Sequence, residues 1–246
     1  MNKKMIGKLV GVLFFLEALF MLPAIAVCFV YGETGAPLRG FLWTVALLLA
    51  LSGALYGVCA KATREFYAKE GFIIVALGWI LLSAMGALPF YISGEIPHYV
   101  DAFFETVSGF TTTGASIILD LDHLSYADNM WRFMMHLLGG FGLIVVALSF
   151  GLFGKRSGAS LYSSEGRSEH VVPNVVQTTQ FIAKIGMGMI FVATVILTAM
   201  CLFLGMEPLR AFLQSLWLAI SGFTTGGFAP MSQSVMYYHW FPLEIV

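Results

Sequence analysis

Two short segments rich in threonine and glycine are the residues of this chain best suited to bind an ion. Ser108-Gly-Phe-Thr-Thr-Thr-Gly114 returns as Ser221-Gly-Phe-Thr-Thr-Gly-Gly227, with the final glycines 113 positions apart. Both segments lie between long apolar stretches, where backbone N–H and C=O groups cannot face lipid without partners. Such a segment is tolerated where it lines a polar cavity, and glycine lets carbonyl groups turn toward a ligand. Because carbonyl rings replace the water around K+ in cation filters, the pair predicts a pore assembled from repeats.

We expect the oxygen ligands to come from the last four residues of each segment, mainly from backbone carbonyls, with threonine hydroxyls as additional ligands. The candidate K+-binding residues are Thr111, Thr112, Thr113 and Gly114 in the first segment, and Thr224, Thr225, Gly226 and Gly227 in the second. The helices that precede them would point C-terminal ends, which carry about half a negative charge, toward the cation. One such segment alone is usually only a turn, so it is the second copy that favours a filter.

The composition is that of an integral membrane protein, with 59% hydrophobic and 11% charged residues and a mean hydropathy of +0.85. A spanning helix needs about 20 mostly apolar residues. The expected spans are Met5–Tyr31, Phe41–Ala60, Gly71–Ile92, Met130–Phe153 and Phe181–Gly205, with a sixth beginning near His239. Two shorter apolar pieces, Val100–Val107 and Leu209–Ile220, directly precede the Thr/Gly segments and are expected to be re-entrant half-helices.

These elements predict an all-α integral membrane protein built from a repeat of outer helix, re-entrant pore half-helix with filter loop, and inner helix. Residues 1–62 hold two additional N-terminal transmembrane helices. Residues 63–170 form the first pore repeat, and residues 171–246 form the second, which stops within its inner helix. An even number of spans in each repeat makes the copies parallel, so that they can surround one axis.

The placement of basic residues predicts the orientation. If the spans alternate, ten of the 13 Lys and Arg residues fall on the side of the N-terminus, and only Arg39, Arg132 and Arg210 fall on the other. The N-terminus is therefore assigned to the cytoplasm, and both filter loops open outside. Seven acidic residues also fall outside and either form an acidic mouth that attracts cations or simply populate external loops. They are Glu95, Asp101, Glu105, Asp120, Asp122, Asp128 and Glu207.

Further motifs accompany the two filter segments: Glu70-Gly-Phe72, Gly86-Ala-Leu-Pro-Phe90, and Trp131-Arg132 followed by Gly139-Gly-Phe-Gly142. With Val107–Ser116 as a first filter and Ser221–Phe228 as a second, they resemble the Trk/Ktr/HKT potassium transporter superfamily, closest to the Trk-type membrane subunit. The two N-terminal helices also fit the Trk branch. The resemblance covers essentially the whole chain.

The resemblance implies a potassium-channel-like fold and K+ uptake across the plasma membrane, the inner membrane of a bacterium. It also implies four non-identical repeats around one pore, a homodimer, and a cytosolic nucleotide-binding regulatory subunit. We expect this chain to supply half of the pore and to need a missing C-terminal half; the alternative is a two-repeat chain that dimerises. Members of the HKT type with Ser at the filter glycine admit Na+, so Gly114 and Gly227 argue for K+.

Other classes of function fit the residues less well. A Na+- or proton-coupled transporter of another class would need intramembrane acidic residues near its substrate, and a membrane scaffold would not need two filter-like loops. No nucleophile–base pair, metal cluster, phosphate-binding loop or nucleic-acid patch is apparent, so we expect no enzyme and no cofactor, with K+ as the transported ion and the lipid bilayer as surroundings.

Three features remain open. Glu17 is expected to be a protonated or paired structural group within the first span. His136 either forms a hydrogen bond behind the filter or is a packing histidine. The glycines between Gly139 and Gly142 are expected to allow close helix packing, with a hinge as the alternative.

Overall fold

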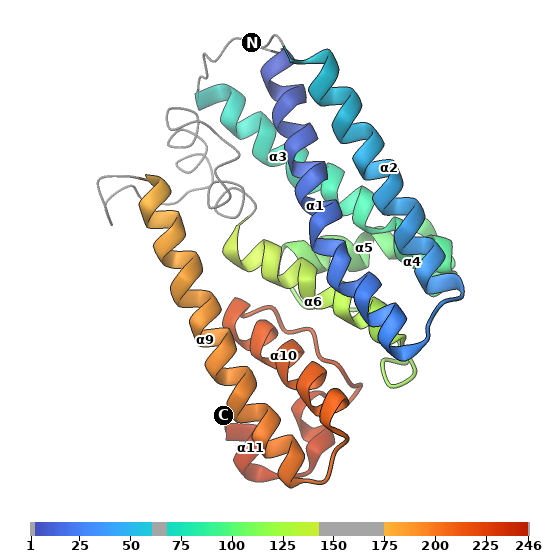
Figure 1. Cartoon of the computed structure of the whole chain (residues 1–246), viewed down its shortest axis with the longest axis vertical. Helices are drawn as coiled ribbons and strands as arrows, with labels where there is room; N and C mark the ends of the chain where they lie inside the picture. Colours follow the sequence, from blue (N-terminus) through green and yellow to red (C-terminus); the bar gives the residue numbers. More distant parts are fainter. Residues whose placement is uncertain (1–2, 61–67, 143–174, 246) are drawn as a thin grey trace.

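The computed structural model describes residues 3–60, 68–142 and 175–245, and every regular element within these ranges is a helix. The N-terminal pair is α1 (Lys3–Tyr31) and α2 (Ala36–Val58). Then follow α3 (Ala68–Gly86), α4 (Leu88–Ser93), α5 (Tyr99–Phe110) and α6 (Tyr126–Phe141), and after the gap α9 (Val175–Phe203), α10 (Pro208–Thr224), the 3-10 helix η1 (Ser234–Tyr238) and α11 (Phe241–Ile245). Figure 1 shows α1 and α2 side by side at one end of the molecule and α9, α10 and α11 at the other.

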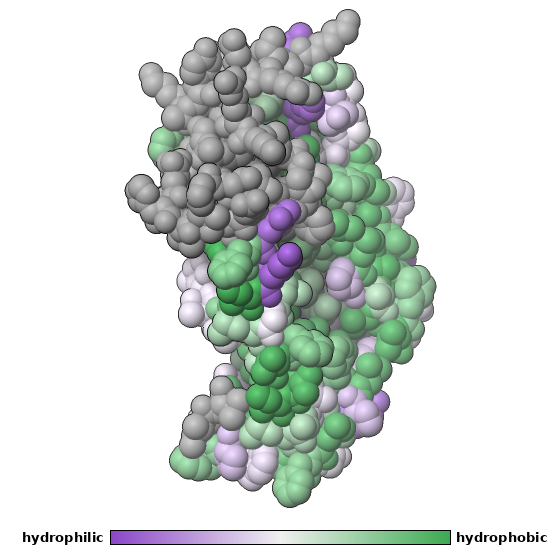
Figure 2. Space-filling model, turned by 60° about the vertical axis from the view of Figure 1, so that its left-hand side comes forward, coloured by the Kyte–Doolittle hydropathy of each residue, from purple (hydrophilic) through white to green (hydrophobic). Residues whose placement is uncertain are grey.

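Four helical stretches in the described ranges are long and apolar enough to cross a membrane: Lys3–Tyr31, Ala36–Val58, Phe72–Ser93 and Gln180–Phe203. They correspond to four of the five complete spans expected from sequence. The fifth, Met130–Phe153, lies outside the described residues beyond Gly142. Large apolar side chains such as Trp43 on α2 and Phe191 on α9 are more than two-thirds exposed, and apolar groups cover much of the face in Figure 2. Such a surface suits lipid as its solvent.

The outer helix of the first repeat is broken near its end. α3 stops at Gly86 and α4 starts at Leu88, with Pro89 in its first turn. Proline has no N–H to continue the helical ladder, which explains the break. The carbonyl of Gly86, at this break, accepts a hydrogen bond of 3.0 Å from the indole Nε1–H of Trp131 on α6. Two motifs 45 residues apart in sequence are thereby joined.

Both half-helices extend further than the sequence predicted. α5 ends at Phe110 rather than Val107, and α10 ends at Thr224 rather than Ile220. The expectation that the filter loops begin at Ser108 and Ser221 is therefore wrong. At each helix end a threonine hydroxyl donates to the carbonyl four residues earlier, Thr111 to Val107 at 2.7 Å and Thr224 to Ile220 at 2.8 Å. The carbonyl of Val107 also accepts from the N–H of Thr111 at 2.9 Å, so the hydroxyl adds a second bond to a carbonyl that the helix already uses.

Helix α6 forms the centre of the described structure. It packs against α1, α5 and α10, and its residues from Ala127 through Leu138 are all buried. A helix that is buried on all sides belongs to the interior of a bundle. Because α6 contacts both half-helices, it is the element that positions the first filter segment relative to the second.

Candidate functional site

The two filter segments share one backbone geometry. Thr112 and Thr225 have φ angles of 53° and 52°, and Gly114 and Gly227 have 77° and 82°. The hydrogen bonds repeat as well, since the N–H of Thr113 donates to Ser108 O at 2.9 Å and the N–H of Gly226 donates to Ser221 O at 2.9 Å. A left-handed threonine is uncommon and is typically kept where a ligand site needs it. The sequence repeat is therefore also a repeat of conformation.

The two segments contact each other through their glycines. A Cβ placed on Gly114 would overlap the carbonyl oxygen of Gly226 and lie 2.9 Å from the Cα of Gly227. A Cβ placed on Gly227 would still lie 3.7 Å from the Cα of Gly114. Glycine is thus required at position 114 for two reasons: the backbone has a positive φ, and a side chain would collide with the second segment. The structure brings Thr113 and Gly114 together with Gly226 and Gly227.

Four of the five threonine hydroxyls of the candidate site, those of Thr111, Thr113, Thr224 and Thr225, form hydrogen bonds within the chain. Besides the bonds of Thr111 and Thr224 to their own helices, the hydroxyls of Thr111 and Thr113 lie 2.8 Å apart. The hydroxyl of Thr225 donates to the carbonyl of Thr224 at 2.7 Å. Thr224 belongs to the last turn of α10 and is buried. Its hydroxyl is therefore turned to its own helix rather than toward a cation.

His136 lies directly behind both segments. Its Nε2 accepts a hydrogen bond of 3.2 Å from the N–H of Phe228, so its Nδ1 carries the proton and donates to the carbonyl of Gly109 at 2.8 Å. The imidazole also stacks on the Phe228 ring, with centroids 4.2 Å apart. Of the two roles considered for this residue, the hydrogen bond behind the filter is confirmed.

The expected acidic mouth needs correction at two of its seven residues. Glu105 and Asp128 are fully buried. Glu105 pairs with Arg132, with Nε and Oε1 at 2.9 Å and no exposure of either side chain. Asp128 accepts a hydrogen bond of 2.7 Å from Ser125 at the start of α6. The sequence contained a clue to the ion pair, because both residues lie in segments that must be buried, and buried charges require partners.

The glycines of α6 allow a close approach to both half-helices. A Cβ on Gly139 would overlap the carbonyl oxygen of Phe110 at the end of α5, and a Cβ on Gly140 would overlap the side chain of Thr224 at the end of α10. The close-packing role expected for these glycines is confirmed. Gly142 ends α6 with a φ of 79°.

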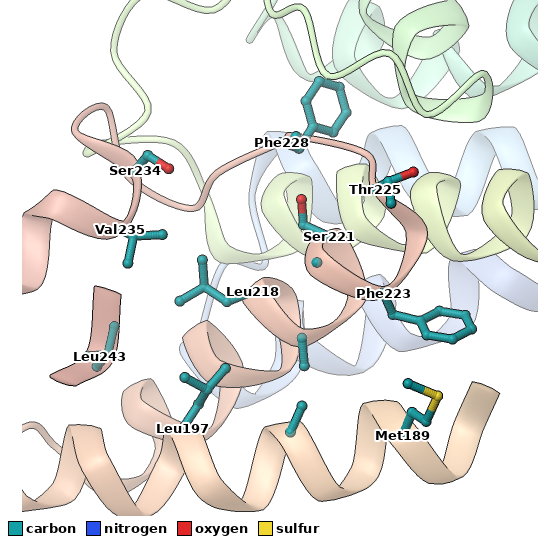
Figure 3. Close-up of a pocket in the computed structure, with 14 residues that line it drawn as sticks. Met189, Leu197, Leu218, Ser221, Phe223, Thr225, Phe228, Ser234, Val235 and Leu243 are labelled. Atoms are coloured by element: carbon teal, nitrogen blue, oxygen red, sulfur yellow. The ribbon is translucent and has the colours of Figure 1, made fainter. Parts of the chain in front are cut away.

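A largely apolar cleft of about 640 Å³ borders the second segment. Figure 3 shows Met189 and Leu197 of α9 on one side, Leu218 and Ser221 of α10 beside them, and Val235 and Leu243 at the far end. Thr225 and Gly227 also line it. Phe228 lines it as well, but in Figure 3 its ring points away from the other labelled residues; it stacks on His136 of α6. In the first repeat, α6 packs against the corresponding half-helix α5.

Comparison with known proteins gives concordant matches. Residues 39–246 match the family described as TrkH, cation transport protein. The chain is 30% identical to the Trk system potassium uptake protein TrkG of Escherichia coli K12, covering 99% of this chain and 49% of that protein. It is 33% identical to TrkH of the same strain, covering 92% and 47%. The chain spans about half the length of these curated relatives.

The crystal structure of the potassium transporter TrkH from Vibrio parahaemolyticus is similar to this chain, with a TM-score of 0.78 and 26% identity. The match covers 100% of this chain and 48% of that one. It confirms the expected all-α membrane fold of the potassium-channel-like class.

Proposed function

We propose, since this chain belongs to the TrkH family of cation transport proteins, that it supplies two filter-forming repeats to a K+ uptake pore. The resemblance found in the sequence motifs agrees with this membership. The observation that carries the proposal is the matched backbone of the two segments, in which the left-handed threonine and the left-handed glycine occur at the same places. Two unrelated turns would have no reason to share these angles, whereas equivalent parts of one filter must.

In this proposal the backbone carbonyls of the two segments replace part of the hydration shell of K+. Thr111, Thr112, Thr113 and Gly114 provide one side, and Thr224, Thr225, Gly226 and Gly227 provide another. Selectivity in such a filter depends on the number, the spacing and the field strength of the carbonyl groups. The C-terminal ends of α5 and α10 lie next to the segments and add partial negative charge. The ion is therefore stabilised mainly by oriented dipoles rather than by a carboxylate.

The remaining pore walls come from other repeats. We propose that these are a C-terminal half of the same protein, with a second two-repeat copy as the alternative arrangement. The coverage supports this view, because the chain spans about half the length of the Trk system potassium uptake proteins that it matches. The proposal keeps the division of the chain into two N-terminal helices (residues 1–62), a first pore repeat (63–170) and a second pore repeat (171–246).

We further propose a multi-pass location in the bacterial inner membrane with the N-terminus in the cytoplasm. The basic-residue bias supports this orientation. A homodimer and a cytosolic nucleotide-binding regulatory subunit belong to the same proposal through the resemblance.

The test is to exchange the filter glycines in the full-length protein and to measure K+ and Na+ uptake in a bacterium that lacks its own K+ transporters. Gly227→Ser is the better variant, because its Cβ has room, whereas Gly114→Ser must displace Gly226. We expect Gly227→Ser to lower the K+/Na+ uptake ratio about tenfold, which corresponds to only about 1.4 kcal/mol.

Gly94→Ser and Gly205→Ser are matched controls. Both glycines have φ near 80°, and a Cβ added to either would have no atom within 4 Å, so they test backbone strain away from the filter. Equal selectivity of Gly227→Ser and the controls would contradict the filter assignment.

A further inference from the structure

Four buried side chains join the two repeats behind the filter segments. This inter-repeat cluster consists of Glu105 on α5, Arg132 and His136 on α6, and Phe228 directly after the second segment. Their exposed fractions are 0%, 0%, 0% and 2%. The Phe228 ring contacts both α6 residues, with the Arg132 guanidinium carbon 4.1 Å and the His136 ring centroid 4.2 Å from its own centroid.

Arg132 binds the chain that leaves each filter segment. After the first segment, it donates to the hydroxyl of Ser116 at 3.3 Å, and its partner Glu105 accepts from that hydroxyl and from the N–H of Ile117 at 2.9 Å. After the second segment, Arg132 donates to the carbonyl of Ala229 at 3.2 Å. One buried guanidinium, oriented by its bond to Glu105, thus holds both stretches of chain. A rigid planar fork of donors suits such a role better than a lysine would.

His136 provides the second link, closer to the filter. It joins the last turn of α5, through Gly109, to the backbone of Phe228. Its ring also packs directly on Gly226, where an added Cβ would overlap the imidazole. The two α6 residues therefore contact the backbone ahead of the ligand residues in the first repeat and after them in the second, and Arg132 also binds the Ser116 hydroxyl after the first segment.

The cluster is not a general packing feature of the repeat. Shifted by the 113-residue offset, Glu105 corresponds to Leu218, Arg132 to Ile245, and Phe228 to Ala115. None of these equivalents is charged or aromatic. The polar network therefore belongs to one boundary, the one at which the first filter segment meets the second.

We infer that Arg132 and His136 are positioning residues that fix the two filter segments against each other, so that ion discrimination depends on contacts behind the filter. This inference rests on the proposed function, because it names what holds the proposed ligands in place. A fully satisfied buried network is rigid and specifies one arrangement. Carbonyl sites distinguish similar cations through small differences in energy, so a modest loosening of the backbone is sufficient to reduce selectivity.

The decisive variant is His136→Leu in the full-length protein, compared with His136→Gln. Leucine removes both hydrogen bonds, and we expect the K+/Na+ uptake ratio to fall about fivefold, the equivalent of a hydrogen bond of ordinary strength. The glutamine amide can both accept and donate a hydrogen bond, so His136→Gln should retain most of the wild-type K+/Na+ uptake ratio. His98→Leu is the matched control, because His98 is exposed and lies outside the cluster.

The same assay applies to the ion pair. Arg132→Lys keeps the charge but loses the fork of donors, and we expect it also to lower the ratio at least about threefold. Arg39→Lys is its control, since Arg39 is exposed and its side chain donates, among the described residues, to the carbonyl of Gly35 in its own segment. A purely structural role would reduce the amount of protein and the maximum rate equally for both ions, leaving the ratio unchanged.

The inference would be overturned if the wild type takes up K+ selectively and His136→Leu, present in the membrane at the normal level, has the same K+/Na+ uptake ratio. Absence of selective K+ uptake by the wild type would instead overturn the proposed function. Should His136→Leu not accumulate, His136→Asn decides: its shorter amide cannot reach both backbone groups, so an unchanged ratio overturns the inference and a reduced one supports it.

Discussion

At the scale of single residues, the described structure contains two kinds of costly arrangement. Thr112 and Thr225 hold left-handed backbone angles at matching places, at a cost of about 1 kcal/mol each. Glu17 is 1% exposed within α1, and neither of its carboxylate oxygens has a hydrogen-bond partner among the described residues. The threonines belong to the proposed filter, whereas Glu17 lies near Gly86 at the break between α3 and α4. Glu17 was expected to be either protonated or paired, and no partner for it is found among the described residues.

We predict that Glu17→Gln leaves the stability of the purified protein within about 0.5 kcal/mol, because the amide keeps the shape and carries no charge. Glu17→Lys should lower it by about 3 kcal/mol, since a charge at this depth has no partner. Thermal unfolding in detergent measures both. Leu16→Gln is the control, because Leu16 is equally buried but apolar. If Glu17→Gln were as damaging as Leu16→Gln, the carboxyl group would have a specific role.

At the scale of elements, the N-terminal helices are connected to the pore repeat through the start of α6. Glu33, in the connection between α1 and α2, accepts hydrogen bonds from the N–H groups of Tyr126 and Ala127 at 2.8 and 3.0 Å. Tyr31 stacks on Tyr126 with centroids 4.0 Å apart. A carboxylate at a helix N-terminus satisfies free donors and complements the helix dipole. The two additional helices therefore support the element that positions both filter segments.

We predict that Glu33→Ala lowers the free energy of unfolding by about 1–2 kcal/mol, as the loss of a helix cap does, and Glu33→Gln by less. Glu207→Ala is the matched control, because Glu207 precedes α10 without a side-chain capping bond. Thermal unfolding in detergent gives the comparison. Equal midpoints for Glu33→Ala and Glu207→Ala would show that the cap contributes nothing.

At the scale of the whole molecule, the loops that follow the two filter segments meet. The N–H of Ser232 donates to Asp122 at 3.0 Å, which places these two loops on one side, as parallel repeats require. Cysteines at Leu119 and Met236 suit a topology test, because these residues are 97% and 67% exposed. Ser125 is unsuitable because its hydroxyl caps α6.

We predict that an impermeant thiol reagent labels Leu119→Cys and Met236→Cys on intact cells and does not label Lys4→Cys. The background replaces Cys28, Cys59 and Cys201, all of which are free and buried. Labelling at Leu119→Cys alone would disprove the parallel arrangement, and labelling at Lys4→Cys would reverse the proposed orientation.

In the proposed function, this chain supplies only two of the segments that line the pore. Two segments enclose only part of a K+ ion, so residues 1–246 expressed alone should give no K+ uptake in a K+ transport-deficient bacterium. Expression is checked by immunoblotting of the membranes. Growth at low K+ comparable to that with the full-length protein would favour two copies that complete one pore.

The length and apolarity of the chain segments were sufficient to predict the all-α membrane fold and four of the spans. These properties are local, because a helix must satisfy its own backbone within lipid. The ends of α5 and α10 were predicted three and four residues early, because the backbone hydrogen bonding of each helix continues past the apolar stretch into the Ser/Gly/Thr residues. That error belongs to local chemistry that composition does not reveal.

The sequence by itself therefore determined which residues repeat and which four of the described segments are long and apolar enough to cross a membrane. Only the tertiary structure decided that Glu105 and Arg132 form a buried pair rather than lining an outer mouth, and that His136 bridges the two repeats. The physical reason is distance along the chain. The partners lie 27 and 92 residues apart, and whether such groups meet depends on how α6 packs between α5 and α10, which no local pattern specifies.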